Sequence, residues 1–264
     1  MKKKLLSILL CLVMVVGLLP TAVLAAGDVE INEANFPDAN FRSYVQTEFD
    51  KDGDNKLSSA EIAAVKEIIA SLRGIKNLKG IEFFTALETL NCVQCELTAL
   101  DVSKNTELTR LECWDNKLTA LDVSKNTKLT RLGCWKNKLT ALDVSKNTEL
   151  TSLNCGFNKL TELDVSKNTK LEMLDCESDP LLGSMRLTEL DVSQNKALKE
   201  LDCYGIKMRE LNVSGCTELE ELDCGGNQLI ALDVSNNVKL TRLRCGSNQL
   251  TALDVSKNLD LTGL

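Results

Sequence analysis

The chain repeats one short phrase so closely that few folds can accommodate it. The ten residues LTALDVSKNT occur letter for letter three times, first at positions 97–106. Repeat units begin every 21 residues from Leu87, with one longer step of 27 residues, and a last unit begins at Leu261. A fixed period between about 20 and 50 residues is typical of a solenoid, in which each unit packs only against its neighbours.

Each unit opens with a short alternation of apolar and polar residues. In LTRLGCW, Leu132 and Cys134 alternate with Arg131, Gly133 and Trp135. Because successive side chains of a strand point to opposite faces, the first pair is predicted to point inward and the other three outward. A single strand of this kind cannot bury its apolar face alone. Stacked in parallel, such strands would build a continuous core beneath an outward sheet surface.

The same units carry the pattern LxxLxCxxNxL, as in Leu108, Leu111, Cys113, Asn116 and Leu118. This pattern resembles the leucine-rich repeat, in particular the short bacterial surface forms related to internalins. The resemblance runs through roughly residues 65 to 264. It implies an α/β repeat fold, a solenoid of 21-residue units with a parallel concave sheet, and a role in recognition. Fold alone does not fix function, so the outward residues have to carry that argument.

Two asparagine columns follow the repeat. One falls where the chain turns out of each strand, and the other falls on the back of the unit. Side-chain amides at such places are expected to satisfy backbone groups inside the turns. The turn column is Asn116, Asn137, Asn158, Asn227 and Asn248, with Cys95 and Ile206 as replacements. The back column is Asn105, Asn126, Asn147, Asn168, Asn195, Asn237 and Asn258, with Cys216 as a replacement. The stretch DPLLGSMR, at 179–186, lengthens one unit and predicts a protruding loop or a small change in curvature.

Eight of the 11 cysteines take the same place in successive units. Their column predicts small buried hydrophobes that stay reduced, because side chains in register on parallel strands do not give the geometry that a disulfide prefers. The chain has no histidine, and Cys92 and Cys95 form its only CxxC spacing, so a metal site built from thiolates is disfavoured. The column is Cys92, Cys113, Cys134, Cys155, Cys176, Cys203, Cys224 and Cys245.

Residues 1–26 have the three lysines, apolar run and small-residue exit of a secretory signal peptide. The alternative is a membrane anchor, but the apolar run is shorter than the ~20 residues that a span needs. We therefore expect a secreted or cell-surface protein without membrane insertion. Removal of the three lysines takes the net charge from -7 to -10, since all 38 acidic residues lie beyond residue 26. Such a chain repels nucleic acid and anionic lipid.

Residues 27–72 are predicted to form a small helical cap on the solenoid, which occupies residues 73–264. The segment 37–49 places its apolar residues on one helical face, and Ile62, Val65 and Ile69 predict a second helix over 61–72. Between them lies DKDGDNKLSSAE, so the order is helix, acidic loop, helix, as in an EF-hand.

The acidic loop predicts a calcium site that stiffens the cap. Aspartates stand at loop positions one, three and five, and a glutamate stands at position twelve, which is the spacing that wraps oxygen ligands round calcium. Asn55 occupies the sixth position, where glycine is usual, and asparagine adopts left-handed geometry more easily than most residues. The alternative is that Ser58 and Glu61 form only a helix capping box. The candidate ligands are Asp50, Asp52, Asp54, Lys56 through its carbonyl, Ser58 and Glu61.

Three classes of function compete. An enzyme is disfavoured because a chain without histidine has no Ser-His-Asp or Cys-His arrangement. A purely structural or accessory part of a larger surface protein is an alternative. We favour a binding module that presents its concave face to a protein or glycan. The residues LTGL at 261–264 begin a repeat, and an uncovered apolar end there would allow end-to-end self-association.

The outward positions, where the units differ, carry the candidate ligand site. The only two tryptophans fall in adjacent units and are expected ~5 Å apart on an open surface, beside Phe157. Beyond them the face becomes acidic, then basic. The alternative is that the two rings simply cover each other. The candidate ligand-binding residues are Arg110, Glu112, Trp114, Arg131, Trp135, Phe157 and Tyr204.

Overall fold

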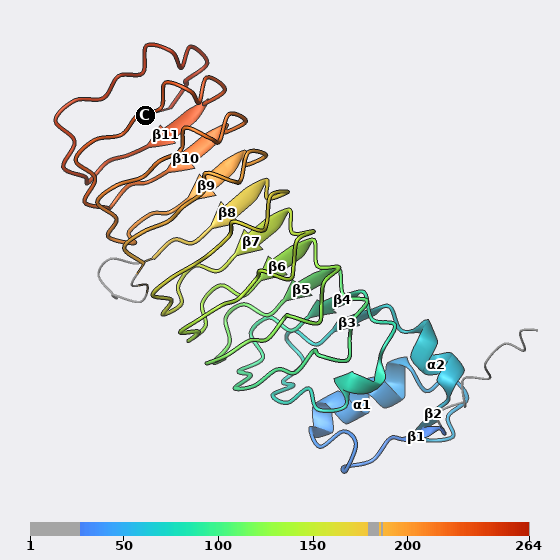
Figure 1. The fold of residues 1–264 in the computed structure, drawn as a ribbon. Coiled ribbons are helices and arrows are strands. Elements are labelled where there is room, and N and C mark those ends of the chain that lie inside the picture. Colours follow the sequence, from blue (N-terminus) through green and yellow to red (C-terminus); the bar gives the residue numbers. More distant parts are fainter. Residues whose placement is uncertain (1–26, 179–184, 186, 264) are drawn as a thin grey trace, which may run out of the picture.

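The computed structural model describes residues 27–178, 185 and 187–263, which form an N-terminal cap followed by an extended solenoid. Its main sheet has nine parallel strands in the order β11-β10-β9-β8-β7-β6-β5-β4-β3, so each strand pairs with its neighbour in sequence. Figure 1 shows these strands following one another along the molecule, with α1 and α2 at the N-terminal end. The predicted parallel repeat solenoid is confirmed. The predicted signal peptide and most of the 179–186 insertion lie outside the described residues.

The bounds of the elements are as follows: β1 Val29–Glu30, α1 Ala39–Glu48, β2 Lys56–Leu57, α2 Ser59–Ala64, β3 Glu67–Ile69, the 3-10 helix η1 Ile81–Phe83, β4 Thr89–Asn91, β5 Arg110–Glu112, β6 Arg131–Gly133, β7 Ser152–Asn154, β8 Met173–Asp175, β9 Glu200–Asp202, β10 Glu221–Asp223 and β11 Arg242–Arg244.

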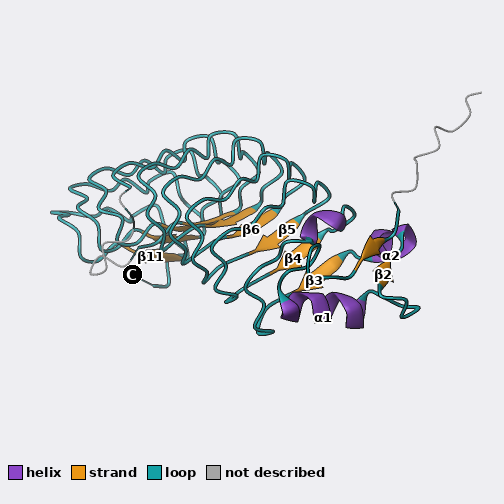
Figure 2. Cartoon of the chain, turned by 90° about the horizontal axis from the view of Figure 1, so that it is seen from below, coloured by secondary structure: helices purple, strands orange, loops and turns teal. Residues whose placement is uncertain are grey.

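The repeated leucines, valines and cysteines build the core. In the unit that contains β5, Leu108, Leu111, Cys113 and Val123 are fully buried. Burying one large aliphatic side chain stabilises a fold by about 1.5–3 kcal/mol, so the regular spacing of these residues supplies the main driving force for stacking. In Figure 2 the strands line one side of the solenoid, and turns without helices form the other side. Among the described residues the helices belong to the N-terminal end, and the repeats are strand and turn.

The turn asparagines hold adjacent units together through both ends of the amide. Asn137 Nδ2 donates to the carbonyl oxygens of Cys113 and Cys134, each at 3.0 Å, and Asn137 Oδ1 accepts from the Leu118 amide at 3.0 Å. Where Cys95 replaces this asparagine, its thiol donates to the Val93 carbonyl at 3.4 Å. The predicted structural role of the turn column is therefore confirmed.

The back asparagines use only the donor end of the amide. Asn126 Nδ2 donates to the carbonyl oxygens of Val102 and Asn105, at 3.0 and 2.8 Å. Its Oδ1 is buried without a partner among the described residues. A position that needs only a donor tolerates cysteine, and the Cys216 thiol lies 3.5 Å from the Val192 carbonyl it donates to.

The predicted second helix over 61–72 is wrong beyond its first third. Helix α2 ends at Ala64, and Glu67–Ile69 form β3, the first strand of the solenoid sheet. Parallel pairing places Ile68 opposite Leu90 of β4, so Ile68 is fully buried while Ile69 is 42% exposed. The β-branched residues of this segment suit a strand, and pairing with the next unit outweighs its helical periodicity. The division of the chain at residue 72 stays a prediction, although the sheet begins before it.

Asp38 is one of the cap residues that hydrogen-bond to the solenoid, as Asn40 also does through its Nδ2 to the Gly74 carbonyl. Asp38 Oδ1 accepts from the amides of Asn40 and Phe41, which caps α1. Its Oδ2 accepts from the amides of Lys76 and Asn77 at 2.8 and 3.1 Å. Phe41 is fully buried in the same core that continues into the repeats. The cap therefore covers the N-terminal end of the repeat core, as predicted.

Candidate functional site

The outward side of the parallel sheet, here called the sheet face, contains a hollow of about 310 Å³ over β5–β8. The walls of the hollow are the side chains of Trp114, Trp135 and Met173, with the β6 backbone as its floor. Gly133 creates this space. At the same register position the neighbouring strands carry Glu112 and Asn154, whereas Gly133 has no side chain.

The two tryptophans and Phe157 form an edge-on row. The ring centroids of Trp114 and Trp135 are 5.8 Å apart at an interplanar angle of 75°, and those of Trp135 and Phe157 are 5.4 Å apart at 67°. The predicted proximity is confirmed. The predicted open exposure is wrong, because all three side chains are half-buried by contact with one another and with the sheet. Trp114 and Trp135 line the hollow, and Phe157 packs against Trp135 outside it.

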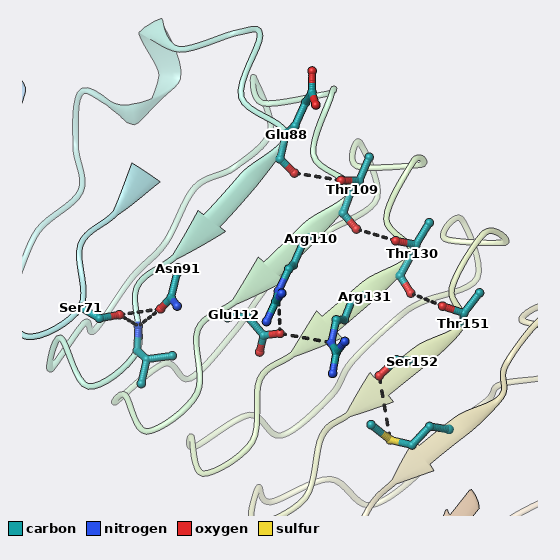
Figure 3. A network of polar contacts seen from close by, with 12 residues as sticks. Ser71, Glu88, Asn91, Thr109, Arg110, Glu112, Thr130, Arg131, Thr151 and Ser152 are labelled. Atoms are coloured by element: carbon teal, nitrogen blue, oxygen red, sulfur yellow. Dashed lines mark hydrogen bonds and ion pairs between the residues drawn. The ribbon is translucent and has the colours of Figure 1, made fainter. Parts of the chain in front are cut away.

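An ion cluster borders the hollow on its N-terminal side. Glu112 Oε1 lies 3.2 Å from Arg110 Nε and 3.5 Å from Arg131 Nε, and the Glu112 side chain is only 12% exposed. Figure 3 shows both guanidinium groups directed at this carboxylate from β5 and β6. The threonines of the same figure bind backbone carbonyls of the preceding unit, as Thr130 Oγ1 does to Thr109 at 3.1 Å. They stabilise the stack at the margin of the site.

A row of three aspartates borders the hollow on its C-terminal side. Asp175, Asp202 and Asp223 lie in register at the ends of β8, β9 and β10. Each Oδ1 accepts from the amide two residues on, at 3.0–3.1 Å, which fixes the carboxylates in place. Asn154 Nδ2 donates to Asp175 Oδ2 at 2.8 Å, and Arg244 Nη1 lies 3.6 Å from Asp223 Oδ2. We call this set the aspartate row.

Burial and mutual repulsion disfavour ionisation of Asp175, Asp202 and the neighbouring Glu177. Burial is the largest cause that raises the pKa of Asp175, to about 7, and the charges of Glu177 and Asp202 add to it against opposing hydrogen bonds. Burial also raises the pKa of Asp202, with a further contribution from Asp223. Burial and the charge of Asp202 raise the pKa of Glu177, while a hydrogen bond with the Trp135 side chain lowers it. The described residues therefore supply too little positive charge to offset the carboxylates of the row.

Tyr204 does not join the hollow. It follows β9, three strands beyond β6, and its ring packs over Gly226, where an added Cβ would lie 3.0 Å from the ring. Besides the inward-pointing Leu132, sequence reasoning also missed four residues that line the hollow. Aligning the strand positions of successive units singles out the glycine, because its column otherwise holds polar side chains. The missed residues are Gly133, Ser152, Asn154 and Met173.

The acidic loop brings three predicted calcium ligands together. One carboxylate oxygen from each of Asp50, Asp52 and Asp54 lies within 4.8 Å of the others. The loop turns through left-handed residues at Gly53 (φ 74°) and Asn55 (φ 66°), as expected for the sixth position. Asp50 is buried and accepts from the Gly53 and Asn55 amides at 2.8 and 2.9 Å. Hard carboxylate oxygens at this spacing fit a calcium ion.

Glu61 lies in a different arrangement from the predicted closing ligand. Its Oε1 accepts from the Lys51 amide at 2.6 Å, and its Oε2 accepts from the Ser58 amide and hydroxyl, both at 2.8 Å. The contacts with Ser58 belong to the capping box of α2, and all of these hydrogen bonds lower the pKa of Glu61, with the Lys51 amide as the largest cause. Lys56 lies in β2 and pairs with Glu30 of β1. The aspartates alone form the cluster in this structure.

All ten cysteines that the structure describes are free thiols, and only Cys245 among them is half-buried, the others being buried. Burial is the largest cause that raises the pKa of each column thiol, for example of Cys224 to about 12. The predicted reduced column is thus confirmed for these residues. Among the described residues, no helix is long and apolar enough to cross a membrane.

Comparison with known proteins shows which proteins the chain resembles. No protein-family model matches it. Internalin J of Listeria monocytogenes is 42% identical over 83 residues, which are 31% of this chain and 9% of that protein. The solved functional domain of internalin J, described as including a cysteine ladder, is 35% identical with a TM-score of 0.61, over 90% of this chain and 61% of that chain. The chain is similar in sequence and fold to this domain of internalin J.

Further solved structures support the internalin-like fold. A Listeria monocytogenes internalin, internalin F, has a TM-score of 0.69 at 24% identity, over 91% of this chain and 78% of its own. The repeat ectodomain of a plant receptor kinase from Arabidopsis thaliana, solved in complex with CASPARIAN STRIP INTEGRITY FACTOR 2, has a TM-score of 0.58 at 22% identity, over 70% of this chain and 24% of its own. These two likenesses concern the fold alone. The internalin-like chain spans less than two thirds of internalin J in either form.

Proposed function

We propose that this chain is a binding module that recognises a protein through its sheet face, at the hollow beside Trp114 and Trp135. The observation that carries the proposal is the hollow, since an apolar recess on an otherwise polar strand surface is the kind of place that holds an anchor side chain. Half-buried aromatic side chains supply contact area with little loss of conformational entropy. The plant receptor above was solved with its partner, which is consistent with a recognition role for such solenoids. No enzymatic step is proposed.

A screen on a surface-protein array tests this function. The parent chain and a Trp114→Ala/Trp135→Ala variant are compared for binding, with Leu259→Ala as a control because that leucine is 87% exposed. Loss of the two rings should weaken binding by at least ~2 kcal/mol, whereas the control should bind as the parent does. Circular dichroism checks that each variant is folded. If the parent finds a partner that both variants bind equally well, the sheet-face hollow is not the site.

We also propose that the cluster of Asp50, Asp52 and Asp54 binds calcium and stabilises the cap. Extracellular sites of this kind have dissociation constants of ~0.1–1 mM. Calcium at ~10 mM would then add about 1.4–2.7 kcal/mol to the free energy of unfolding. The same cap is covalently continuous with β3, so calcium should protect the first repeats most.

A charge-removing variant separates calcium binding from helix capping. In the parent, Asp52 Oδ1 accepts a hydrogen bond from the Asp54 amide at 3.2 Å, and Asp54 Oδ1 accepts one from the Lys56 amide at 2.8 Å. The Asp52→Asn/Asp54→Asn variant keeps a side-chain oxygen at each position for these two hydrogen bonds. It should abolish the calcium-dependent rise in melting temperature. Glu61→Gln removes a charge from the capping box and serves as the comparison. If the aspartate variant still responds to calcium as the parent does, the cluster is not the site.

The leader-like residues 1–26 and the likeness to internalins favour a secreted or cell-surface location, which we include in the proposal. Amino-terminal sequencing of protein recovered from the growth medium or cell surface tests it. A retained leader on intracellular protein would contradict it.

A further inference from the structure

The hollow and the aspartate row adjoin on the sheet face and differ in chemistry. The hollow extends over β5–β8 with its middle at Gly133 of β6 and Asn154 of β7, and Asp202 lies at the end of β9. Neighbouring strands of a sheet are ~4.8 Å apart, so the middle of the hollow and Asp202 are ~10–14 Å apart across the strands. Met173 of β8 lines both the hollow and the smaller recess of about 210 Å³ beneath the aspartate row. A ligand that runs along the solenoid axis would touch both.

Most polar groups round the hollow already have partners, which argues against a sugar, although Asn154 Oδ1 has none among the described residues. Ser152 Oγ is directed at Met173 Sδ at 3.9 Å, and Asn154 Nδ2 is held by Asp175. Glu112 is shared by two arginines, as Figure 3 shows. Part of the aromatic surface is already in contact, since the Trp114 and Trp135 rings meet at an interplanar angle of 75° and Lys136 Nζ lies 5.6 Å from the Trp135 ring centroid. An apolar side chain requires none of these groups and fits the hollow.

The aspartate row calls for a cation. No described lysine or arginine lies within ion-pair distance of Asp175 or Asp202, and Arg244 reaches only Asp223, at 3.6 Å. Asp202 Oδ2 accepts no hydrogen bond from any described residue, although Oδ1 is fixed by the Tyr204 amide. A partly buried carboxylate without a counter-charge is costly, and a ligand cation would relieve that cost. Phosphate groups and acidic segments are repelled by the same row.

We propose that the partner is a protein segment with an apolar anchor side chain in the hollow and a lysine or arginine on the aspartate row, two to four residues away along an extended chain. The spacing follows from the ~10–14 Å between the features and ~3.4 Å per residue of extended chain, less the reach of the basic side chain. This inference rests on the proposed function, since it specifies what the sheet face recognises.

Two substitutions test the two halves of the inference separately. Gly133→Asn fills the hollow with the residue that Asn91 and Asn154 place at the same register position. Its Cβ would meet the flexible end of Glu112, which can move aside, so the repeat should still fold. Asp202→Asn removes the charge at the centre of the row. The matched control for the glycine is Gly246→Asn, because an added Cβ there would meet no other atom within 4 Å. The matched control for the aspartate is Asp143→Asn, an exposed position whose side chain accepts a hydrogen bond from the Ser145 amide.

The probe is a set of short neutral peptides, fluorescently labelled, that carry one leucine and one lysine at separations from one to about six residues, with glutamate in place of lysine as a second set. Fluorescence polarisation with the whole chain measures affinity. Separations of two to four should bind most tightly, glutamate should abolish binding, and added salt should weaken it. Gly133→Asn and Asp202→Asn should each weaken binding roughly tenfold, and the controls should not.

The outcomes separate this inference from the proposed function. Binding that is indifferent to the lysine position and to Asp202→Asn, yet lost in Gly133→Asn, overturns the charged half and leaves sheet-face recognition standing. Peptide binding unchanged in both variants overturns the inference and speaks against the sheet face as a whole. If no peptide binds at millimolar concentration, or if a glycan array yields a sugar whose binding Gly133→Asn abolishes, the inference is wrong, and the protein-array screen with the tryptophan variant decides the function independently.

Discussion

The raised pKa of Asp175 makes a sharp prediction about stability and pH. In the folded state the pKa is about 7, and in an unfolded chain an aspartate has a pKa of about 3.9. The folded state therefore holds the proton more tightly, so the contribution is fully present below the unfolded pKa and is lost as pH rises through the folded pKa. Between pH 5 and pH 8 the parent should lose about 2.5 kcal/mol of unfolding free energy through this group alone.

The substitution that tests this is Asp175→Asn. An asparagine cannot ionise, and it can pair with Asn154, whose Oδ1 is buried without a partner among the described residues and whose amide can turn over. The variant should be more stable than the parent at pH 8, and its stability should change far less from pH 5 to pH 8. The chain has no histidine, so few other groups titrate in this window.

Urea denaturation followed by circular dichroism at several pH values measures the effect. Asp143→Asn serves as the control, because hydrogen bonds from Ser145 lower the pKa of Asp143 and move its titration below the window. Its slope between pH 5 and pH 8 should match the parent's. Parallel slopes for the parent and Asp175→Asn would refute the reasoning, since they would mean that Asp175 is ionised throughout.

Three further predictions concern the stack and its cap. Asn137→Ala orphans the buried groups that Asn137 pairs with and should cost about 3 kcal/mol or more in urea melts, whereas the exposed Lys138→Ala should cost under ~0.5 kcal/mol. Gly80→Ala should destabilise the cap, because Gly80 has φ 104° and a Cβ would lie 2.3 Å from the Phe36 ring; local protease cleavage near the cap that equals the parent's would contradict this. In native protein a thiol reagent should react first with Cys245, because this thiol is only half-buried, although burial still raises its pKa. The other, buried column cysteines should react only in denaturant. Rapid labelling of the whole column in native protein would contradict this and would show that the core opens.

The sequence by itself determined the repeat architecture. Leucines and cysteines at a fixed period can bury their side chains only by stacking, and the Asn137 amide pairs with backbone groups of the turn, as its place in the repeat predicts. The loop spacing likewise placed three aspartates within reach of one another, because ligand geometry there is a local property of the turn. These features depend on neighbours close in sequence or one period away.

Where the sequence pattern was compatible with two conformations, only the tertiary structure decided between them. The segment at Ile68 has helical periodicity, yet it forms a strand because its backbone pairs with the edge of β4. The tryptophans are adjacent as expected, but their half-burial depends on how Trp135 packs against Phe157 and on the space above Gly133. Glu61 suits both a metal ligand and a helix cap, and the backbone amides of Lys51 and Ser58 decide for the cap in this structure. In each case the outcome rests on contacts across strands or turns, which a linear pattern does not contain.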